Sequence, residues 1–316
     1  MHLHDRFATF LSASEIIEAT PALLNDQRRR FVSSPDIVLQ PNSVESVQKI
    51  MRFCFENRIR VTPQGGNTGL CGATVTTEGV LLNLSKLNRI RDINLADNSM
   101  TVEAGVILQN AQKAAAEAGR LFPLSLASEG SCQIGGNIAC NAGGLNVLRY
   151  GSMRDLVLGL EVVLPNGELV SHLQPLHKNT TGYDLRHLFI GSEGTLGIIT
   201  AATLKLFAQP KTKATAWVGL DDIESAVSLL TAVQGHFAER LISFELISRF
   251  ALDLSSEFSQ LKKPADAEWH ILIELADSIP DAGLDEKLAE FLYQNGWENS
   301  ILAQSEQERS DLWKIG

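Results

Sequence analysis

The residues of this chain that are best suited to chemistry lie in a glycine-rich stretch. Residues 63–73 read Pro-Gln-Gly-Gly-Asn-Thr-Gly-Leu-Cys-Gly-Ala, with four glycines within eight positions and no lysine. Glycine lets a ligand approach the main chain closely, and successive backbone N–H groups in such a turn form a concave anion site. The stretch is neither a Walker A loop nor a G-x-G-x-x-G motif. It predicts a phosphate cradle, with an ordinary surface turn as the alternative.

Two further stretches of small residues favour the cradle. Residues 130–144 contain Gly-Gly-Asn and Gly-Gly pairs, and residues 191–200 read Gly-Ser-Glu-Gly-Thr-Leu-Gly-Ile-Ile-Thr. Random loops would not need alanine and glycine in place of charged residues. Three such stretches predict several backbone segments that close around one large, flat ligand with a polar tail.

Length and composition limit the class of protein. The 316 residues allow two domains, and a hydrophobic content of 44% is that of a globular protein. The net charge of −10, from 27 basic and 37 acidic residues, disfavours a nucleic-acid partner. We expect no transmembrane helix, because no apolar run reaches 18 residues, and no signal peptide, because the basic-then-apolar pattern is missing.

The cysteines and histidines predict no metal site. The four cysteines lie at positions 54, 71, 132 and 140, and none forms a C-x-x-C pair. We expect them to be small buried packing residues in a reducing compartment. The histidines from position 172 onward show neither H-x-H nor H-x-x-x-H spacing.

The elements that position the glycine stretches can be predicted from the hydrophobic pattern. We expect a polar helical segment over residues 1–35 and a first domain over 36–212. That domain should hold strands at 37–41, 59–61, 80–84, 100–104, 157–164 and 203–207. A helix should begin after Ser43 as N-cap, with its apolar positions reaching Phe55, and another should cover 106–118, closed by Gly119.

A second domain is expected over residues 213–316. Strands at 217–220, 241–246 and 269–275 alternate there with helices at 221–233, to about 258, and at 281–295. This alternation, without a glycine-rich loop, predicts a second sheet covered by helices. A cap over the ligand of the first domain is the natural role for it, since ligand sites prefer domain interfaces.

The motifs of the first domain resemble a known family. The stretches at 63–72 and 130–144 are followed by Tyr-Gly-Ser-Met-Arg-Asp at 150–155, Asn-Thr-Thr-Gly-Tyr-Asp at 179–184 and Phe-Ile-Gly-Ser-Glu-Gly-Thr at 189–195. In this order they resemble the flavin-binding domain of the vanillyl-alcohol-oxidase superfamily, from about residue 36 to residue 209. Within it they are similar to D-2-hydroxyglutarate dehydrogenases, D-lactate dehydrogenases and the flavin subunit of glycolate oxidase.

The resemblance implies the fold class and the cofactor. The fold would be α+β: a PCMH-type FAD-binding domain of two α/β subdomains, followed by an incomplete α+β cap domain for the substrate. The protein would be a flavoprotein that binds FAD without a covalent link, because the first loop carries Asn67 and Thr68 and no histidine.

The resemblance also implies which residues contact FAD. Residues 64–70 would bind the pyrophosphate, residues around 123–128 would pass near the flavin, residues 130–141 would line the dinucleotide, and residues 194–199 would pack on the adenine side. The residues expected at the cofactor are Pro63, Gln64, Gly65, Gly66, Asn67, Thr68, Gly69, Leu70, Pro123, Ser125, Ala127, Ser128, Gly130, Ser131, Ile134, Gly135, Gly136, Asn137, Ala139, Asn141, Gly194, Gly197, Ile198 and Ile199.

The chain departs from the family near its end. In the family a Leu-Trp-x-x-Arg motif supplies a carboxylate-binding arginine, and a later histidine-rich segment binds a divalent metal such as zinc. Here residues 312–316 read Leu-Trp-Lys-Ile-Gly, with Gly316 at the arginine position, and the histidine-rich segment is missing. We therefore expect an incomplete cap, and we name no catalytic residue and no metal ligand.

The implied function is that of an FAD-dependent oxidoreductase. It would oxidise a D-2-hydroxy acid of the D-2-hydroxyglutarate, D-lactate or glycolate class by hydride transfer to flavin N5. Two alternatives stay open: an FAD-binding subunit or fragment without its own turnover, and a product that does not fold. The implied partners are the hydroxy acid, a quinone, cytochrome or electron-transfer flavoprotein as acceptor, and a second copy in a homodimer. We expect it to be cytoplasmic or peripheral to the inner membrane.

Overall fold

The computed structural model describes residues 2–259, 266–280 and 282–314. Two compact units are present. The first unit comprises Met1–Gly143 and Ser152–Phe207, and the second comprises Gly144–Gly151 and Ala208–Gly316. The short segment at residues 144–151 thus folds with the C-terminal part of the chain, although it lies within the sequence of the first.

The N-terminal segment is not the helix predicted for residues 1–35. It forms α1 (Leu3–Phe7), a 3-10 turn at Ala13–Glu15, β1 (Ile16–Ile17) and α2 (Pro21–Leu24). Pro21 can only begin a helix because it lacks the backbone N–H. The β-branched pair in β1 joins a sheet instead, with Ile16 opposite Leu39.

The first sheet carries the first glycine stretch at its edge. Its order is β1-β2-β4-β3, formed by β2 (Ile37–Leu39), β3 (Val61–Gln64) and β4 (Val80–Asn83), with β2 and β3 parallel to β4. The strand predicted at 59–61 therefore begins later and extends into the glycine stretch. Gln64 pairs with Asn83 in this ladder, which fixes the point at which the loop leaves the sheet.

Helix α3 (Val44–Glu56) joins β2 to β3 as predicted. The Ser43 hydroxyl accepts a hydrogen bond from the backbone N–H of Ser46 at 3.1 Å, which confirms the N-cap. Val47, Ile50, Met51 and Cys54 are buried on one face. The inward position predicted for residue 55 is wrong, because Phe55 falls outside this stripe and is 60% exposed.

The second sheet of the first unit is antiparallel. Its order is β5-β6-β10-β8-β9. The strands are β5 (Ile90–Asn94), β6 (Ser99–Glu103), β8 (Val157–Val163), β9 (Leu169–His172) and β10 (Ile198–Lys205). The strand predicted at 203–207 therefore begins earlier, inside the third glycine stretch, because Ile198 and Ile199 pair with Val163 and Val162.

Further helices and two short strands lie between residues 108 and 208. They are α4 (Leu108–Glu117), β7 (Arg120–Leu121), α5 (Ile134–Ala139), α7 (Met153–Leu156), α8 (Arg186–Phe189) and β11 (Phe207–Ala208), which pairs with β7. Gly119 follows α4 with a φ of +70°, the left-handed conformation predicted for it. The short helix α5 was not predicted, and it carries the centre of the second glycine stretch.

Charged side chains cross the second sheet in one network. Glu103, whose side chain is 1% exposed, accepts hydrogen bonds from Arg89 and Arg91, and Arg91 also pairs with Glu161 at 3.1 Å. Burial opposes ionisation of Glu103, but the hydrogen bonds and charges of the two arginines outweigh it and lower the pKa of that carboxyl. The network thus holds β5, β6 and β8 together through paired charges.

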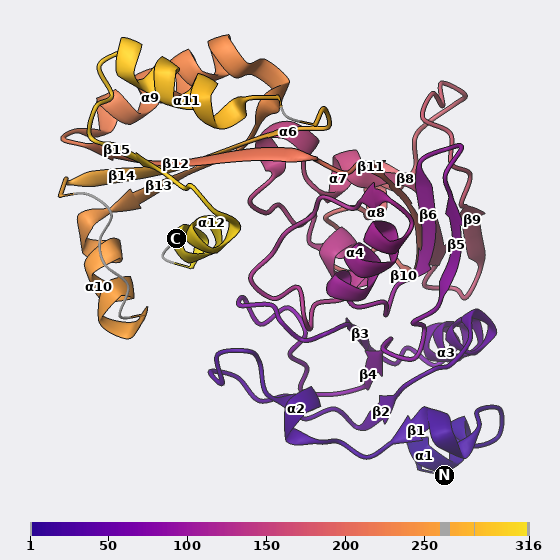
Figure 1. The fold of residues 1–316 in the computed structure, drawn as a ribbon. Coiled ribbons are helices and arrows are strands. Elements are labelled where there is room, and N and C mark those ends of the chain that lie inside the picture. Colours follow the sequence, from indigo (N-terminus) through magenta and orange to yellow (C-terminus); the bar gives the residue numbers. More distant parts are fainter. Residues whose placement is uncertain (1, 260–265, 281, 315–316) are drawn as a thin grey trace. The chain divides into compact units, whose positions relative to one another are not determined.

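The second unit is a four-stranded antiparallel sheet with helices (Figure 1). Its order is β13-β14-β12-β15, from β12 (Thr212–Leu220), β13 (Leu241–Ser248), β14 (Trp269–Asp277) and β15 (Ser300–Leu302). The helices are α6 (Val147–Tyr150), α9 (Ile223–Phe237), α10 (Arg249–Ser259), α11 (Leu284–Gln294) and α12 (Glu306–Trp313), with a 3-10 turn at Ala238–Arg240. The mixed composition of both units confirms the predicted α+β class.

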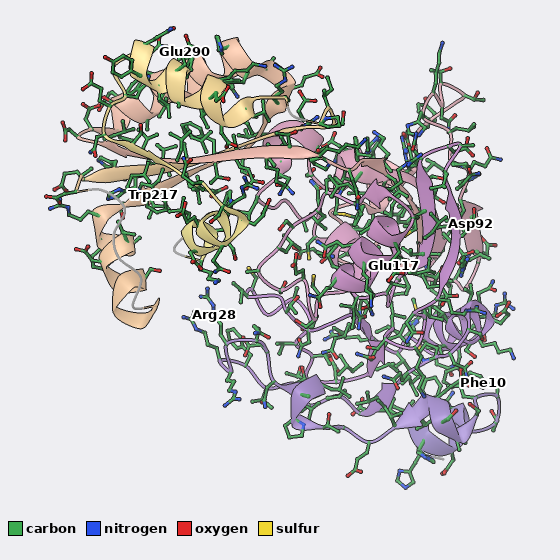
Figure 2. The ribbon with its side chains drawn as sticks, viewed as in Figure 1. Phe10, Arg28, Asp92, Glu117, Trp217 and Glu290 are labelled. Atoms are coloured by element: carbon green, nitrogen blue, oxygen red, sulfur yellow. The ribbon has the colours of Figure 1, made fainter. Side chains whose placement is uncertain are left out.

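The two faces of this sheet are packed differently. Helices α9 and α11 cover one face with a core of aliphatic and aromatic side chains, and Glu290 on α11 points outward (Figure 2). On the other face Trp217 packs with Leu252 and Leu272 and donates a hydrogen bond to His270 Nδ1 at 3.1 Å. The predicted covered sheet is present, although β15 and α12 were not predicted. The arginine position of the Leu-Trp-x-x-Arg motif, Gly316, lies outside the described residues.

Candidate functional site

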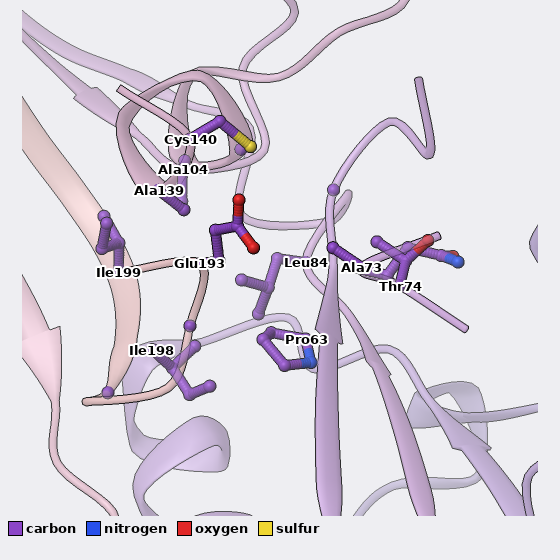
Figure 3. Close-up of a pocket in the computed structure, with 16 residues that line it drawn as sticks. Pro63, Ala73, Thr74, Leu84, Ala104, Ala139, Cys140, Glu193, Ile198 and Ile199 are labelled. Atoms are coloured by element: carbon purple, nitrogen blue, oxygen red, sulfur yellow. The ribbon is translucent and has the colours of Figure 1, made fainter. Parts of the chain in front are cut away.

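The three glycine stretches meet at one pocket of the first unit (Figure 3). The first stretch enters from β3, the second from α5, and the third from the loop that precedes β10. The predicted site residues that line the pocket are Pro63, Gln64, Gly65, Gly135, Gly136, Ala139, Gly194, Gly197, Ile198 and Ile199. Segments more than 120 positions apart in the sequence therefore form one site.

Missing side chains allow these stretches to touch. A Cβ on Gly66 would lie 2.1 Å from the backbone oxygen of Ser131, and one on Gly135 would lie 2.6 Å from the Cβ of Ala104. Gly194 adopts a φ of +77°, and a Cβ there would lie 2.4 Å from Cγ of Pro63. Gly136 differs from these three, because among the described residues no atom outside its own stretch of helix lies within 4 Å of its Cβ position, and the residue lines the pocket. Its side of α5 is open to a ligand.

The first loop offers a row of backbone donors. Among the described residues, no backbone carbonyl accepts a hydrogen bond from the N–H groups of residues 66–71. Asn67 in this row has a φ of +54°, so the backbone adopts the left-handed conformation at this residue. Successive N–H groups without protein partners can form a concave anion site, so this loop is consistent with the cradle predicted from the glycines, which stays a prediction.

Three polar side chains of the predicted site already have protein partners. Gln64 is buried and donates to the Leu23 carbonyl at 2.9 Å. Asn67 donates to the Asn25 carbonyl at 2.6 Å, and Asn141 Oδ1 accepts from the Arg154 N–H at 2.9 Å. These side chains shape the loops through contacts within the protein.

The remaining predicted residues do not line the pocket. Residues 123–131 form the connection from β7 toward α5, where the Ser128 carbonyl accepts from the N–H groups of Ser131 and Cys132. Ile134 and Asn137 are buried on α5. The predicted residues outside the lining are Gly66, Asn67, Thr68, Gly69, Leu70, Pro123, Ser125, Ala127, Ser128, Gly130, Ser131, Ile134, Asn137 and Asn141.

Six lining residues were not predicted from the sequence. They are Ala73, Thr74, Leu84, Ala104, Cys140 and Glu193. Ala73, Cys140 and Glu193 were overlooked although they lie inside the three stretches, and the other three adjoin a stretch or follow a strand. The Glu193 carboxylate projects into the pocket in Figure 3.

The cysteines follow the prediction only in part. Cys54 and Cys132 are buried, as predicted, whereas Cys71 and Cys140 are exposed because they belong to the loops around the pocket. Burial raises the pKa of the Cys54 thiol to about 12. Burial, the Glu193 carboxylate and Cys71 together raise the pKa of the Cys140 thiol, so this lining residue is a neutral thiol near pH 7.

Neither a metal centre nor a membrane span emerges from the described residues. Over 2–259, 266–280 and 282–314, no three side chains of His, Cys, Asp or Glu converge as metal ligands would. The helices of that same part of the chain are all too short or too polar to cross a membrane.

Family comparisons match both halves of the chain. Residues 35–172 match the FAD binding domain, and residues 209–316 match the C-terminal domain of FAD linked oxidases. The pocket lies in the unit that contains the first match. The small lining residues of the pocket, the open side of α5 and the N–H groups of the adjoining first loop are of the kind that suits the flat rings and the pyrophosphate of FAD.

Curated relatives have similar sequences. The chain is 37% identical over 295 residues to the D-2-hydroxyglutarate–pyruvate transhydrogenase of Saccharomyces cerevisiae, covering 90% of this chain and 59% of the relative. Identity to the mitochondrial D-2-hydroxyglutarate dehydrogenase of Danio rerio is 40% over 269 residues, covering 84% of this chain and 50% of the relative. Identity to the D-2-hydroxyglutarate dehydrogenase of Stutzerimonas stutzeri is 34% over 322 residues, covering 99% of this chain and 69% of the relative.

The chain belongs to the family of FAD-linked oxidoreductases that contains the D-2-hydroxyglutarate dehydrogenases. It spans about half to two thirds of the length of these relatives. This membership confirms the resemblance predicted from the motifs.

Solved structures share the fold at low sequence identity. An alkyldihydroxyacetonephosphate synthase superposes with a TM-score of 0.78 at 16% identity, covering 99% of this chain and 67% of that one. A p-cresol methylhydroxylase superposes with a TM-score of 0.78 at 18% identity, covering 97% and 67%. The fold of the chain is therefore that of these proteins.

Proposed function

We propose that the protein is an FAD-dependent dehydrogenase that oxidises a D-2-hydroxy acid to the 2-oxo acid. The observation that carries the proposal is the pocket of the first unit, which all three glycine stretches line, together with the adjoining first loop, whose N–H groups at residues 66–71 have no backbone partner among the described residues. Similarity to D-2-hydroxyglutarate and D-lactate dehydrogenases supports the class of substrate.

In this proposal the chain holds the cofactor mainly through its backbone. The N–H groups of residues 66–71 bind the pyrophosphate, and Gly136 leaves room for a ring or phosphate against α5. Residues 194–199 pack on the adenine side, and residues 123–128 pass near the flavin. The predicted site residues outside the pocket lining are part of this proposal as well. Bound FAD supplies the acceptor for a hydride from C2 of the substrate.

The binding is proposed to be non-covalent, and no catalytic residue is assigned within the described chain. Lys213, a cation of the second unit, already pairs with Glu274 at 2.9 Å. The substrate carboxylates need cationic partners and the hydroxyl needs a base, and we leave both roles without a named residue.

The electron acceptor, the oligomeric state and the location of the protein are part of the proposal as well. Electrons would pass to a quinone, a cytochrome or an electron-transfer flavoprotein, and two copies would form a homodimer. A cytoplasmic location, or one peripheral to the inner membrane, brings the protein to such acceptors.

The test is reduction of the bound flavin by substrate. The chain is loaded with FAD, made anaerobic and titrated with D-2-hydroxyglutarate, D-lactate or glycolate, with L-2-hydroxyglutarate as the control. We expect one of the first three to bleach the flavin absorbance, and the L-enantiomer to leave it unchanged. Flavin bands that persist with all of them would contradict turnover and support the alternative, a chain that holds FAD without its own reaction.

A further inference from the structure

Among the described residues that line the pocket, Glu193 is the one that carries a charge. The other lining residues described by the structure are glycines, small or aliphatic residues, Gln64, Thr74 and Cys140. Glu193 is exposed, and Figure 3 shows its carboxylate in the opening between Cys140 and Leu84. A ligand in the pocket would therefore meet a negative charge at this point and nowhere else along the lining.

The backbone of Glu193 is held in a conformation that favours glycine. Its φ is +51°, in the left-handed region. The Glu193 N–H donates to the Ala139 carbonyl at 2.9 Å, and the next residue, Gly194, rests on Pro63. The third stretch is thus fixed against the other two, and this strained position aims a carboxylate into the pocket. Arg58 has a similar φ outside the pocket, so it is the place of the Glu193 carboxylate in the pocket, and not the φ alone, that points to a role for this side chain.

Electrostatics restricts what that role is. A carboxylate repels a pyrophosphate, so the anionic part of FAD is favoured at the N–H groups of residues 66–71 and disfavoured beside Glu193. An ionised carboxylate accepts hydrogen bonds and donates none. The matching part of the ligand is one that donates: the hydroxyl groups of its sugar chains. Acidic side chains bind ribose hydroxyls in other dinucleotide sites for the same reason.

We propose that the Glu193 carboxylate accepts hydrogen bonds from sugar hydroxyls of the dinucleotide and so sets the direction in which FAD lies in the pocket. This inference rests on the proposed binding of FAD. The hydroxyls belong either to the ribose of the adenosine half or to the ribityl chain of the flavin half. Both present neighbouring hydroxyl groups that suit one carboxylate.

The experiment removes the carboxylate and the backbone strain together. Glu193→Gly should leave the apo-protein with a melting temperature equal to or above that of the wild type, because glycine tolerates this φ. The same variant should bind FAD about tenfold more weakly, as expected for the loss of a hydrogen bond to a charged group. Arg58→Gly is the matched control, since Arg58 has a φ of +54°, is exposed and does not line the pocket.

Binding is measured by calorimetry with FAD, ADP and FMN. ADP carries the ribose and FMN carries the ribityl chain, so the ligand whose affinity also falls in Glu193→Gly identifies the sugar that is bound. Glu193→Gln, which keeps the shape and loses the charge, should show a smaller loss in the same direction. FAD affinity of Glu193→Gly within twofold of the wild type would overturn the inference, as would a loss seen for FAD and for neither ADP nor FMN.

Two further results keep the inference separate from the proposed function. If the apo melting temperature of Glu193→Gly falls, Glu193→Gln decides, and wild-type FAD affinity in that variant overturns the inference. Failure of the wild-type protein itself to bind FAD would overturn the proposed function and, with it, this inference.

Discussion

Gly66 and Ser131 bring the first two glycine stretches into direct contact: a Cβ on Gly66 would lie 2.1 Å from the Ser131 backbone oxygen. That oxygen belongs to the main chain and cannot rotate away. Gly66→Ala should therefore destabilise the first unit by about 1–3 kcal/mol, the usual cost of overpacking. Thermal unfolding of the apo-protein checks this.

The control for Gly66→Ala lies three residues further along the loop. Gly69 has no atom within 4 Å of its Cβ position, and its φ is not in the left-handed region. Gly69→Ala should unfold at the wild-type temperature. Equal melting temperatures for the two variants would show that the contact between the stretches is looser than the structure has it.

Gly136→Val should remove cofactor binding without harming the fold. The Cβ position of Gly136 faces open space at the pocket, so the valine side chain fills room that a ligand needs. Helix propensity does not oppose the change, because glycine is the poorer residue within a helix. We expect FAD affinity to fall by about tenfold or more, measured by flavin fluorescence, with circular dichroism unchanged.

Gly235→Val is the matched control, because Gly235 also lies in a helix, α9, with no atom within 4 Å of its Cβ position. It should bind FAD as the wild type does. Gly136→Val protein that is yellow and fully loaded with flavin after purification would refute this use of the pocket.

The ion network around Glu103 should make the first unit sensitive to acid. Its folded pKa is lowered, so its contribution to stability is present above the unfolded pKa of about 4.3 and is lost as pH falls through the lower folded value. The melting temperature of the wild type should fall further between about pH 6 and pH 3.5 than the melting temperature of Glu103→Gln. If the melting temperatures of the two proteins fall equally over that pH range, Glu103 does not supply this sensitivity.

Bound flavin should leave the protein on denaturation. The first loop offers Asn67 and Thr68 where some members of the superfamily carry a linking histidine. After acid precipitation of the loaded protein, we expect all flavin absorbance in the supernatant. Flavin that stays with the precipitate would disprove the non-covalent link.

Periodic and capped elements could be predicted from the sequence. Helix α3 has the Ser43 cap and a regular apolar stripe, and β4 and β8 are continuous buried runs. In these elements local preference and burial agree, so sequence pattern is sufficient. The N-terminal helix was wrong because Pro21 and the β-branched pair at 16–17 favour a turn and a strand.

The second glycine stretch shows where local preference fails. Helix α5 contains two glycines in six residues, which disfavours a helix on propensity alone. It forms because Gly135 packs on Ala104 and its N–H donates to the Ala104 carbonyl at 2.7 Å. These partners lie about 30 positions away, so the sequence pattern could not reveal them.

The site could be predicted as a set of loops and less well as side chains. Glycines mark where backbones approach a ligand or each other, and all three stretches do meet at the pocket. Gly136 faces open space and Gly66 faces Ser131, and this difference depends on the three-dimensional structure and has no signal in the sequence. The same holds for Gln64 and Asn67, whose partners Leu23 and Asn25 lie in the N-terminal segment.

The most direct test of the central claim, that the pocket of the first unit holds FAD, is a comparison of visible absorption spectra. Wild-type protein and Gly136→Val are purified in parallel, incubated with excess FAD and freed of unbound cofactor by gel filtration. We predict flavin bands in the wild type and their loss in the variant, with both proteins folded by circular dichroism. A colourless wild type, or a variant that retains the same flavin bands, would contradict the account.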